Sequence, residues 1–150
     1  MSKQDAVIFD MDGTLCNVTE IRHLVVGGVR NFEAFHRQSV NCPPHLHVVE
    51  AAHKARSDGH AVLIVTARKA KFRNHTAMWL ALNGVPSDAM LMRADHDNRK
   101  DVEVKRDILR QIRRTWNPIH AWDDNPAIIS LWNEEGIPCT IVPGWDEGVT

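Results

Sequence analysis

The sequence has few cysteines and no long apolar segment. Cys16, Cys42 and Cys139 are its three cysteines among 150 residues, too few and too scattered for a disulfide framework. This usage is typical of the reducing cytosol, so we expect a cytoplasmic protein. No apolar run approaches the roughly 18–20 residues that span a bilayer, and the N-terminus lacks the apolar stretch and cleavage site of a signal peptide. We therefore expect neither disulfides nor contact with a membrane.

An excess of one charge sign is also lacking. The chain has 18 Lys or Arg and 19 Asp or Glu, a net charge of -1, which argues against a strongly basic nucleic-acid-binding protein. The charges are unevenly distributed, however. Residues 68–114 hold 12 basic and 6 acidic residues, a net of +6, whereas the rest of the chain has a net of -7. The near-zero total therefore leaves room for an anion-binding face beside an acidic site.

Length and composition favour one globular domain over residues 1–150. The hydrophobic share of 43% and the charged share of 25% are ordinary for a globular protein, and a chain this long can bury a core without disulfides. We detect no linker or internal repeat. We expect the core to cover about 5–142, followed by a short irregular tail.

Short apolar runs alternate with helical patterns along most of the chain. The runs lack polar alternation, as is typical of strands that are buried on both faces of a parallel sheet; they cover 6–9, 61–65, 89–92, 119–122 and 137–142. The helical patterns cover 44–57, 72–83, 101–116 and 125–135. This alternation predicts an α/β protein with three α/β/α layers and a Rossmann-like parallel sheet.

Details of the helices and of the first long connection can also be predicted. We expect Leu46, Val49 and either Ala52 or His53 to share the buried face of the first long helix, and Asn125 to cap the last one. Between the first two strands, residues 23–30 indicate a small hairpin about a Gly27-Gly28 turn. Residues 31–38 indicate a short helix.

Polar residues follow several of the predicted strands. Asp10 ends the first run, Thr66 ends the second, and Asp123 and Asp124 end the fourth. Ligands of parallel α/β sheets bind at the carboxyl ends of the strands, so these side chains converge if the three strands are neighbours. Lys105, early in the 101–116 helix, can point to the same edge. The sequence therefore predicts one site with several carboxylates, a hydroxyl group and a lysine.

The chemistry that uses such a set is metal-assisted phosphoryl transfer. Clustered carboxylates repel one another and call for a hard cation, so we expect Mg²⁺; the candidate ligands are Asp10, Asp12, Asp123 and Asp124. One of two closely spaced aspartates, Asp10, can attack phosphorus to form an aspartyl-phosphate, while Asp12 protonates the leaving oxygen and then activates water.

The phosphoryl group itself needs partners at the same edge. We expect Thr66 and Lys105 to hold it during transfer, together with loop amides around Gly13.

The motifs resemble those of a known superfamily. Asp10-Met11-Asp12-Gly13-Thr14-Leu15 after an apolar strand resembles the signature of the haloacid dehalogenase (HAD) superfamily of phosphatases. Thr66, Lys105 and Asp123-Asp124 resemble its second, third and fourth motifs, in the family's order. The resemblance covers nearly the whole chain, and it implies a HAD-like fold and the catalytic roles given above.

A narrower resemblance is to the 3′-phosphatase domain of phage-type polynucleotide kinase-phosphatases. It rests on Thr66-Ala67-Arg68 and on the run Arg-Lys-Asp-Val-Glu-Val-Lys that ends at Lys105. It implies that Arg68, Asp101 and, more loosely, Arg22 are further substrate-binding residues. It also implies a phosphorylated substrate, the 3′ end of DNA or RNA. The sequence contains no G-x-x-x-x-G-K-[ST] kinase motif, so we expect a stand-alone phosphatase. No feature of the sequence identifies a protein partner.

The spacing of the motifs limits any cap domain. Only 53 residues separate Asp12 from Thr66, and 38 separate Thr66 from Lys105. Because predicted core elements fill most of both stretches, we expect a minimal cap or none. The resulting open site favours large substrates such as nucleic-acid ends.

The sequence leaves several alternatives open. The protein could be a nucleotidase or another small-molecule phosphatase, or a non-catalytic regulatory or nucleic-acid-binding domain on the same fold. Asp101 could cap its helix, and Asp124 could lie behind the metal ligands. Cys42, His45 and His47 invite a zinc interpretation, but their spacing matches no recognised zinc motif and a second cysteine pair is missing.

Overall fold

The predicted strands form one parallel sheet. The structure is a computed structural model that describes residues 2–26, 28 and 30–144. Every strand pairs in parallel with its neighbours, in the order β3-β2-β1-β4-β5. The strands are β1 (Gln4–Phe9), β2 (Ala61–Lys69), β3 (Ala89–Arg93), β4 (Trp116–Asp123) and β5 (Cys139–Ile141). This order makes β1 the direct neighbour of β2 and β4, as the predicted site requires.

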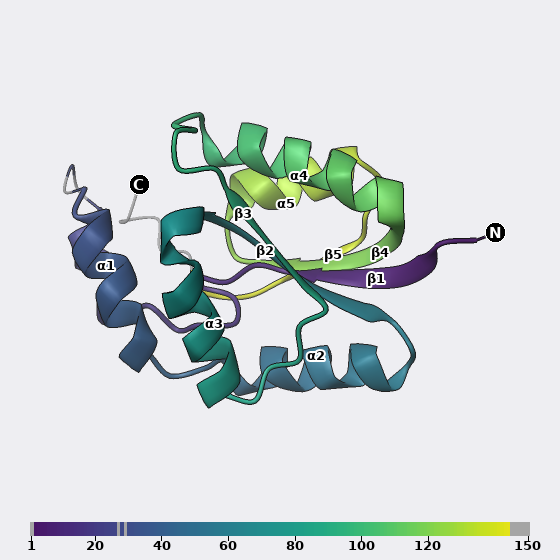
Figure 1. Cartoon of the computed structure of the whole chain (residues 1–150), viewed down its shortest axis with the longest axis horizontal. Coiled ribbons are helices and arrows are strands. Elements are labelled where there is room, and N and C mark those ends of the chain that lie inside the picture. Colours follow the sequence, from purple (N-terminus) through teal and green to yellow (C-terminus); the bar gives the residue numbers. More distant parts are fainter. Residues whose placement is uncertain (1, 27, 29, 145–150) are drawn as a thin grey trace.

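Two pairs of helices cover the sheet and complete the three layers. α2 (Leu46–Ser57) and α3 (Arg73–Leu82) lie on one face, and α4 (Asp101–Thr115) and α5 (Pro126–Glu134) lie on the other (Figure 1). α1 (Phe32–Gln38) stands apart from these layers, beyond the carboxyl ends of the strands (Figure 1). The predicted three-layer α/β/α architecture is confirmed.

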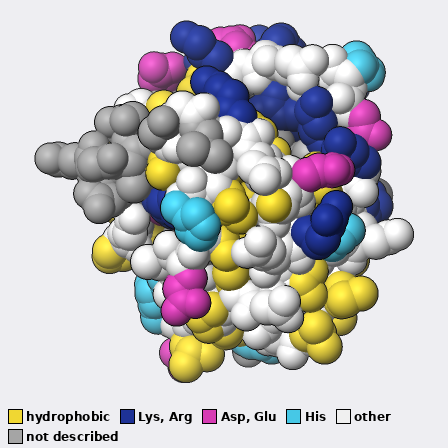
Figure 2. Space-filling view, turned by 90° about the vertical axis from the view of Figure 1, so that its left-hand side faces the viewer, with side chains coloured by type: hydrophobic (Ala, Val, Ile, Leu, Met, Phe, Trp, Pro, Cys, Tyr) yellow, Lys and Arg dark blue, Asp and Glu magenta, His cyan; other side chains and the backbone are white. Residues whose placement is uncertain are grey.

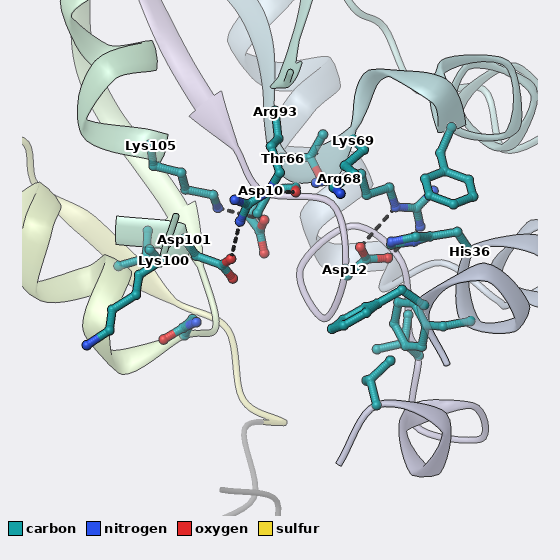
Figure 3. A pocket seen from close by; sticks show the side chains of 18 of the residues that line it. Asp10, Asp12, His36, Thr66, Arg68, Lys69, Arg93, Lys100, Asp101 and Lys105 are labelled. Carbon is teal, nitrogen blue, oxygen red and sulfur yellow. Dashed lines mark hydrogen bonds and ion pairs between the residues drawn. The ribbon is translucent and has the colours of Figure 1, made fainter. Parts of the chain in front are cut away.

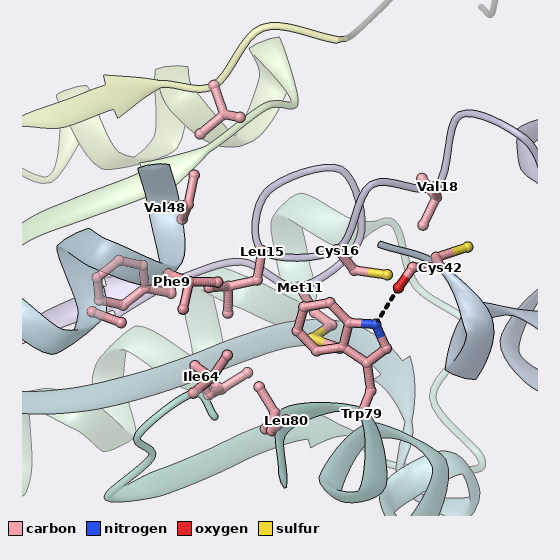
Figure 4. Packing of buried hydrophobic residues seen from close by; sticks show 14 of the residues in the cluster. Phe9, Met11, Leu15, Cys16, Val18, Cys42, Val48, Ile64, Trp79 and Leu80 are labelled. Carbon is pink, nitrogen blue, oxygen red and sulfur yellow. Dashed lines mark hydrogen bonds between the residues drawn. The ribbon is translucent and has the colours of Figure 1, made fainter. Parts of the chain in front are cut away.

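Alternate residues of the central strands face opposite layers. Val7 and Phe9 of β1 pack in a cluster with residues of α2 and α3, whereas Ala6 and Ile8 pack with residues of α4 and α5. In the first cluster Trp79 is fully buried, and its indole Nε1 donates to the Cys42 carbonyl oxygen at 2.8 Å (Figure 4). Burial on both faces explains why these strands are apolar without alternation.

The helix patterns predicted the helices well, with one wrong position. Asn125 caps α5 by accepting a hydrogen bond from the amide of Ala127, and Pro126 is the first helical residue. Leu46, expected on the buried face of α2, is 68% exposed. At about 100° per residue it lies roughly 200° around the helix from Val48, which faces the core.

The connection between β1 and α2 departs from the predicted hairpin. Arg22–Leu24 form the 3-10 helix η1, and the described residues of 23–30 pair with no strand; Gly27 lies outside the described part. Leu24 and Val25 pack against the core instead, and the amide of Asn31 donates to the Leu24 carbonyl oxygen at 2.9 Å. Burial of these apolar side chains therefore replaces strand pairing.

The short helix at 31–38 is confirmed as α1, with Asn31 as its N-cap. Between β1 and α2 the described residues form only α1 and two 3-10 turns, η1 and η2 (Ser39–Asn41), so this insertion is small. The tail at 145–150 lies outside the described residues. None of the described helices has the length and apolar character needed to cross a membrane.

Candidate active site

The carboxyl ends of β2, β1 and β4 converge on one cavity of about 700 Å³. Asp10 follows β1, Thr66 lies in β2, and Asp123 ends β4. Lys105 reaches the same cavity from the second turn of α4, and Asp12 lines it from the loop after β1 (Figure 3). The side chains that we expected to converge at the ends of neighbouring strands therefore do line one cavity.

A buried lysine connects two of the carboxylates. Lys105 is 2% exposed, and its Nζ donates to Asp10 Oδ1 at 2.8 Å and to Asp123 Oδ2 at 3.1 Å. Burial by itself lowers the pKa of a lysine, but the two carboxylates outweigh it and raise the pKa of Lys105 above its usual range. Lys105 therefore stays charged, and it holds Asp10 in place.

Three carboxylates lie close enough to share a cation. Oxygens of Asp10, Asp123 and Asp124 lie within 4.8 Å of one another. Burial, reinforced by the neighbouring carboxylates, raises the pKa of Asp123 to about 6 and that of Asp124 to about 8. Without a bound cation, the cluster is therefore expected to take up a proton near neutral pH. Carboxylate oxygens are hard donors that Mg²⁺ binds together with water and phosphate oxygens, so these residues can supply protein ligands to the expected metal.

The fourth expected metal ligand lies elsewhere. The Asp12 carboxylate is outside this cluster and faces Arg68, whose Nε and terminal nitrogen donate to its two oxygens at 2.9 and 2.5 Å (Figure 3). Burial alone would raise the pKa of Asp12, but the charge and hydrogen bonds of Arg68 outweigh it and lower the pKa. The geometry thus gives the Asp12 side chain a different environment from the other three aspartates.

Arg68 was expected to bind substrate, but its guanidinium group is engaged within the protein. Besides Asp12, it donates to Ser39 Oγ and Thr76 Oγ1, each at 3.0 Å, and it is 2% exposed. Ser39 is 29 residues and Thr76 eight residues from Arg68 in the sequence, and neither spacing belongs to a local pattern that indicated these bonds. In this arrangement Arg68 orients Asp12.

Gly13 contributes space rather than a free amide. Its N–H donates to the Cys16 carbonyl oxygen at 2.8 Å, so the expected amide contact with phosphate does not come from Gly13 itself. Its φ of +84° favours glycine, and a Cβ there would lie 2.0 Å from Asp124 Oδ2. Arg22 also approaches this point, with a terminal nitrogen 3.5 Å from Asp124 Oδ2. Arg22 thus lies at the site, and its role in substrate binding stays a prediction.

Asp101 does not cap its helix. Lys100 is the N-cap residue of α4, and no side chain makes a capping bond there. The Asp101 carboxylate instead accepts a 2.6 Å hydrogen bond from Arg93, which the sequence reading missed. Arg93 also donates to the carbonyl oxygens of Ala67 at 2.8 Å and Asp97 at 3.1 Å. Arg93 therefore connects the end of β2 to the start of α4, the helix that carries Lys105. The sequence feature that could have indicated Arg93 is its position directly after the apolar run at 89–92.

The two threonines of the site act on different groups. Thr66 is 1% exposed, and its hydroxyl oxygen accepts the amide N–H of Arg68 at 3.1 Å. Thr14, for which we predicted no role, donates to Asp10 Oδ2 at 3.0 Å and lies 3.4 Å from Asp124 Oδ1. Asp10 is therefore held from two sides, by Lys105 and by Thr14.

The zinc interpretation gains no support. Among the described residues, Asp10, Asp123 and Asp124 form the one group of His, Cys, Asp or Glu that could hold a metal ion. Cys42, His45 and His47 do not form such a group.

Only part of the basic excess faces the cavity. Nine Lys or Arg and seven Asp or Glu line it, and Figure 2 shows Lys and Arg side chains gathered on one part of the molecular end that it displays. Other arginines of the 68–114 segment lie along α4 in ion pairs: Arg106 and Arg113 with Glu135, and Arg110 with Asp107. The anion-binding face is thus smaller than the charge count implied.

Comparison with known proteins places this site in a family. The model of the polynucleotide kinase PNKP phosphatase domain matches residues 4–145. The chain belongs to this family. That family is described as a phosphatase domain, and the resemblance to HAD phosphatases is confirmed.

Solved structures agree with this assignment. A chain in the structure of a Pnkp1/Rnl/Hen1 complex is 26% identical, with a TM-score of 0.80, over 94% of this chain and 46% of that one. This chain thus spans less than half of that relative. Class C acid phosphatase from Bacillus anthracis shares the fold at 13% identity and a TM-score of 0.69, covering 99% of this chain and 70% of its own.

A further similar structure is that of a phosphatase in complex with magnesium and phosphate. D,D-heptose 1.7-bisphosphate phosphatase from B. bronchiseptica, in complex with magnesium and phosphate, is 15% identical with a TM-score of 0.60. The match covers 92% of this chain and 79% of that one. It shows that the fold is shared.

Proposed function

We propose that this chain is a Mg²⁺-dependent phosphomonoesterase that removes the 3′-phosphate from a DNA or RNA end through an aspartyl-phosphate. The observation that carries the chemistry is the position of Asp10. Its carboxylate lines the cavity and is oriented by Lys105 Nζ at 2.8 Å and Thr14 Oγ1 at 3.0 Å. A buried carboxylate held in this way is well placed for nucleophilic attack.

The two half-reactions use Asp10 and Asp12. In the first, an Asp10 oxygen bonds to phosphorus, the ester P–O bond breaks, and Asp12 gives a proton to the departing 3′-oxygen. In the second, Asp12 takes a proton from water, whose oxygen bonds to phosphorus and releases inorganic phosphate and free Asp10. Thr66 and Lys105 hold the phosphoryl oxygens during both steps.

Arg68 sets the starting state of Asp12. By lowering the pKa of Asp12, the ion pair favours the carboxylate, which suits the second half-reaction. A bound phosphate dianion brings negative charge near Asp12, and like charge raises a carboxyl pKa. We infer that substrate binding thereby promotes the protonated form that the first half-reaction needs.

Asp10, Asp123 and Asp124 would hold Mg²⁺. The cation would neutralise the carboxylates and the phosphoryl oxygens, which lowers the electrostatic cost of bringing two anions together. Asp12, although expected as a ligand, is better placed for proton transfer because its carboxylate faces Arg68.

Family membership and the cavity support a nucleic-acid end as substrate. The family is described as a phosphatase domain of polynucleotide kinase, and a relative occurs in a structure described as an RNA repair complex. The cavity of about 700 Å³ exceeds what a phosphate alone requires. A nucleotidase remains the second candidate, since the same cavity would admit a mononucleotide.

The test is a substrate panel with and without Mg²⁺. It contains one oligonucleotide sequence with a 3′-phosphate or a 5′-phosphate, as DNA and as RNA, together with 3′- and 5′-mononucleotides. We expect Mg²⁺-dependent release of phosphate, fastest from the 3′-phosphorylated oligonucleotides, and its loss in Asp10→Asn. Faster turnover of mononucleotides would favour the nucleotidase, and no phosphate release from any substrate would favour a non-catalytic domain.

A further inference from the structure

One wall of the cavity is aromatic, and the phosphoryl chemistry does not use it. It consists of Phe32, Phe35 and His36 from α1 and Phe72 from η3 (Ala70–Phe72); we call these four residues the aromatic wall. The His36 ring lies 4.5 Å from Phe72, 5.1 Å from Phe35 and 6.4 Å from Phe32, centroid to centroid. The four rings thus form one cluster around His36, in which Phe32 alone has a large exposed area.

Two members of the wall are poorly accounted for by packing alone. Phe32 is 46% exposed and lines the cavity, although a large aromatic side chain is normally buried. His36 is 7% exposed, and none of the described residues forms a hydrogen bond with its Nδ1. Buried polar atoms are normally paired. The accessible part of the wall is the exposed Phe32 ring, and such an apolar face fits a planar aromatic ligand.

The wall lies on the side of the cavity where the leaving group would be. Asp10 is held by Lys105 on one side of the site, whereas Asp12 is turned toward Arg68 and His36 (Figure 3). If Asp10 attacks phosphorus and Asp12 protonates the departing oxygen, the nucleoside carrying that oxygen lies toward Asp12. The terminal base is then within reach of the aromatic wall.

We propose, on the basis of the proposed function, that the aromatic wall is a binding subsite for the terminal nucleobase, with Phe32 as the stacking residue. Stacking on an aromatic ring suits every base because each has a π-face. His36 is neutral at pH 7, since burial lowers its pKa to about 4, so its ring adds no charge to the wall.

Cations beside the wall suit the rest of a nucleic-acid strand. Arg30 and Lys100 line the cavity and form no ion pair with a described residue. Lys69 and Lys71 lie on the same rim, where Lys71 is near Glu33 at 3.7 Å. Aromatic faces beside unpaired cations are the usual combination for single-stranded nucleic acid.

The experiment compares two oligonucleotides that differ only in the terminal nucleoside, made of DNA or of RNA according to which the substrate panel shows to be dephosphorylated faster. Both carry a 3′-phosphate; one ends in an ordinary nucleoside and the other in a tetrahydrofuran abasic analogue. We expect the wild-type chain to lose about tenfold in kcat/KM on the abasic end, mainly through KM, which is typical of one stacked base. Phe32→Ala should lose about as much on the ordinary end and far less on the abasic end, while Phe32→Trp should restore the preference.

Met78→Ala is the matched control, since Met78 is 53% exposed on α3 and does not line the cavity. It should keep the wild-type preference for the ordinary end. Equal wild-type rates on the two ends, or equal losses on both in Phe32→Ala, would overturn the base subsite while leaving 3′-phosphatase activity intact. Failure of the wild-type chain to release phosphate from either oligonucleotide would instead refute the proposed function, and the subsite with it.

Discussion

Arg68 offers the sharpest test of how this site is built. Its guanidinium group makes four side-chain hydrogen bonds, two to Asp12 at 2.9 and 2.5 Å and one each to Ser39 and Thr76 at 3.0 Å. The Arg68 side chain is 1% exposed and that of Asp12 is 24% exposed. In Arg68→Ala the Asp12 carboxylate therefore stays largely buried without its counter-charge.

The size of the effect follows from this burial. Removing one partner of a buried ion pair destabilises a protein by about 3–5 kcal/mol, and the residual exposure of Asp12 places the expected loss near the lower end, at about 3 kcal/mol. For a chain of this size that corresponds to a fall of roughly 6–12 °C in Tm. Arg68→Lys keeps the charge but not the two-pronged bond to Asp12, so its loss should be smaller.

Urea unfolding measures this loss, with an unchanged m-value as evidence that only stability has changed. Arg113→Ala is the matched control, because Arg113 is 42% exposed and pairs at 3.0 Å with Glu135 at the surface; such pairs contribute about 0–1 kcal/mol. The double variant Asp12→Asn/Arg68→Ala should be much less destabilised than the sum of its parts. Equal stabilities of Arg68→Ala and Arg113→Ala, or full additivity in the double variant, would refute the reasoning.

Three further predictions concern the neighbouring groups. Gly13→Ala should lower Tm and weaken Mg²⁺ binding, because its Cβ would lie 2.0 Å from Asp124 Oδ2. Gly84→Ala is the control: Gly84 also has a positive φ but lies in open space, so this variant should lower Tm only. Equal effects of the two variants on Mg²⁺ binding would contradict this prediction. Mg²⁺ at 100 times its Kd should raise the free energy of unfolding of the wild-type chain by about 2.7 kcal/mol. At the same Mg²⁺ concentration, Asp124→Asn should lose most of that gain, as measured by calorimetric unfolding with and without Mg²⁺. An undiminished gain would exclude Asp124 as a ligand. His36 has a pKa of about 4 in the folded chain against an ordinary 6.5, so the unfolded chain binds more protons between these values and stability should fall as pH drops from 6.5 toward 4. Asp12, Arg68, His75 and Lys71 also act on this ring, so the measurement is the difference in slope between wild type and His36→Gln, and identical slopes would count against the assignment.

The sequence by itself determined the fold class and the main catalytic candidates. Apolar runs without alternation occur where strands are buried on both faces, so the runs at 6–9 and 61–65 identified β1 and β2 without any tertiary information. The acidic motif beginning at Asp10 is contiguous in the chain, and strand ends are local features. Pattern and motif could therefore place Asp10, Thr66, Lys105 and Asp123 at one edge, where the structure has them.

Tertiary structure alone decided how the polar groups pair. Arg68 meets Asp12, Ser39 and Thr76, and Arg93 meets Ala67 and Asp101. Most of these contacts join elements that are distant in the chain, and a propensity or period carries no information about which distant group a guanidinium will reach. The same limit applies to Phe32 and Leu46: both are apolar by sequence, yet one lines the cavity and the other faces solvent. Local sequence motifs indicate the candidate residues of such a site, whereas three-dimensional packing determines which of them can bind substrate and which hold the others in place.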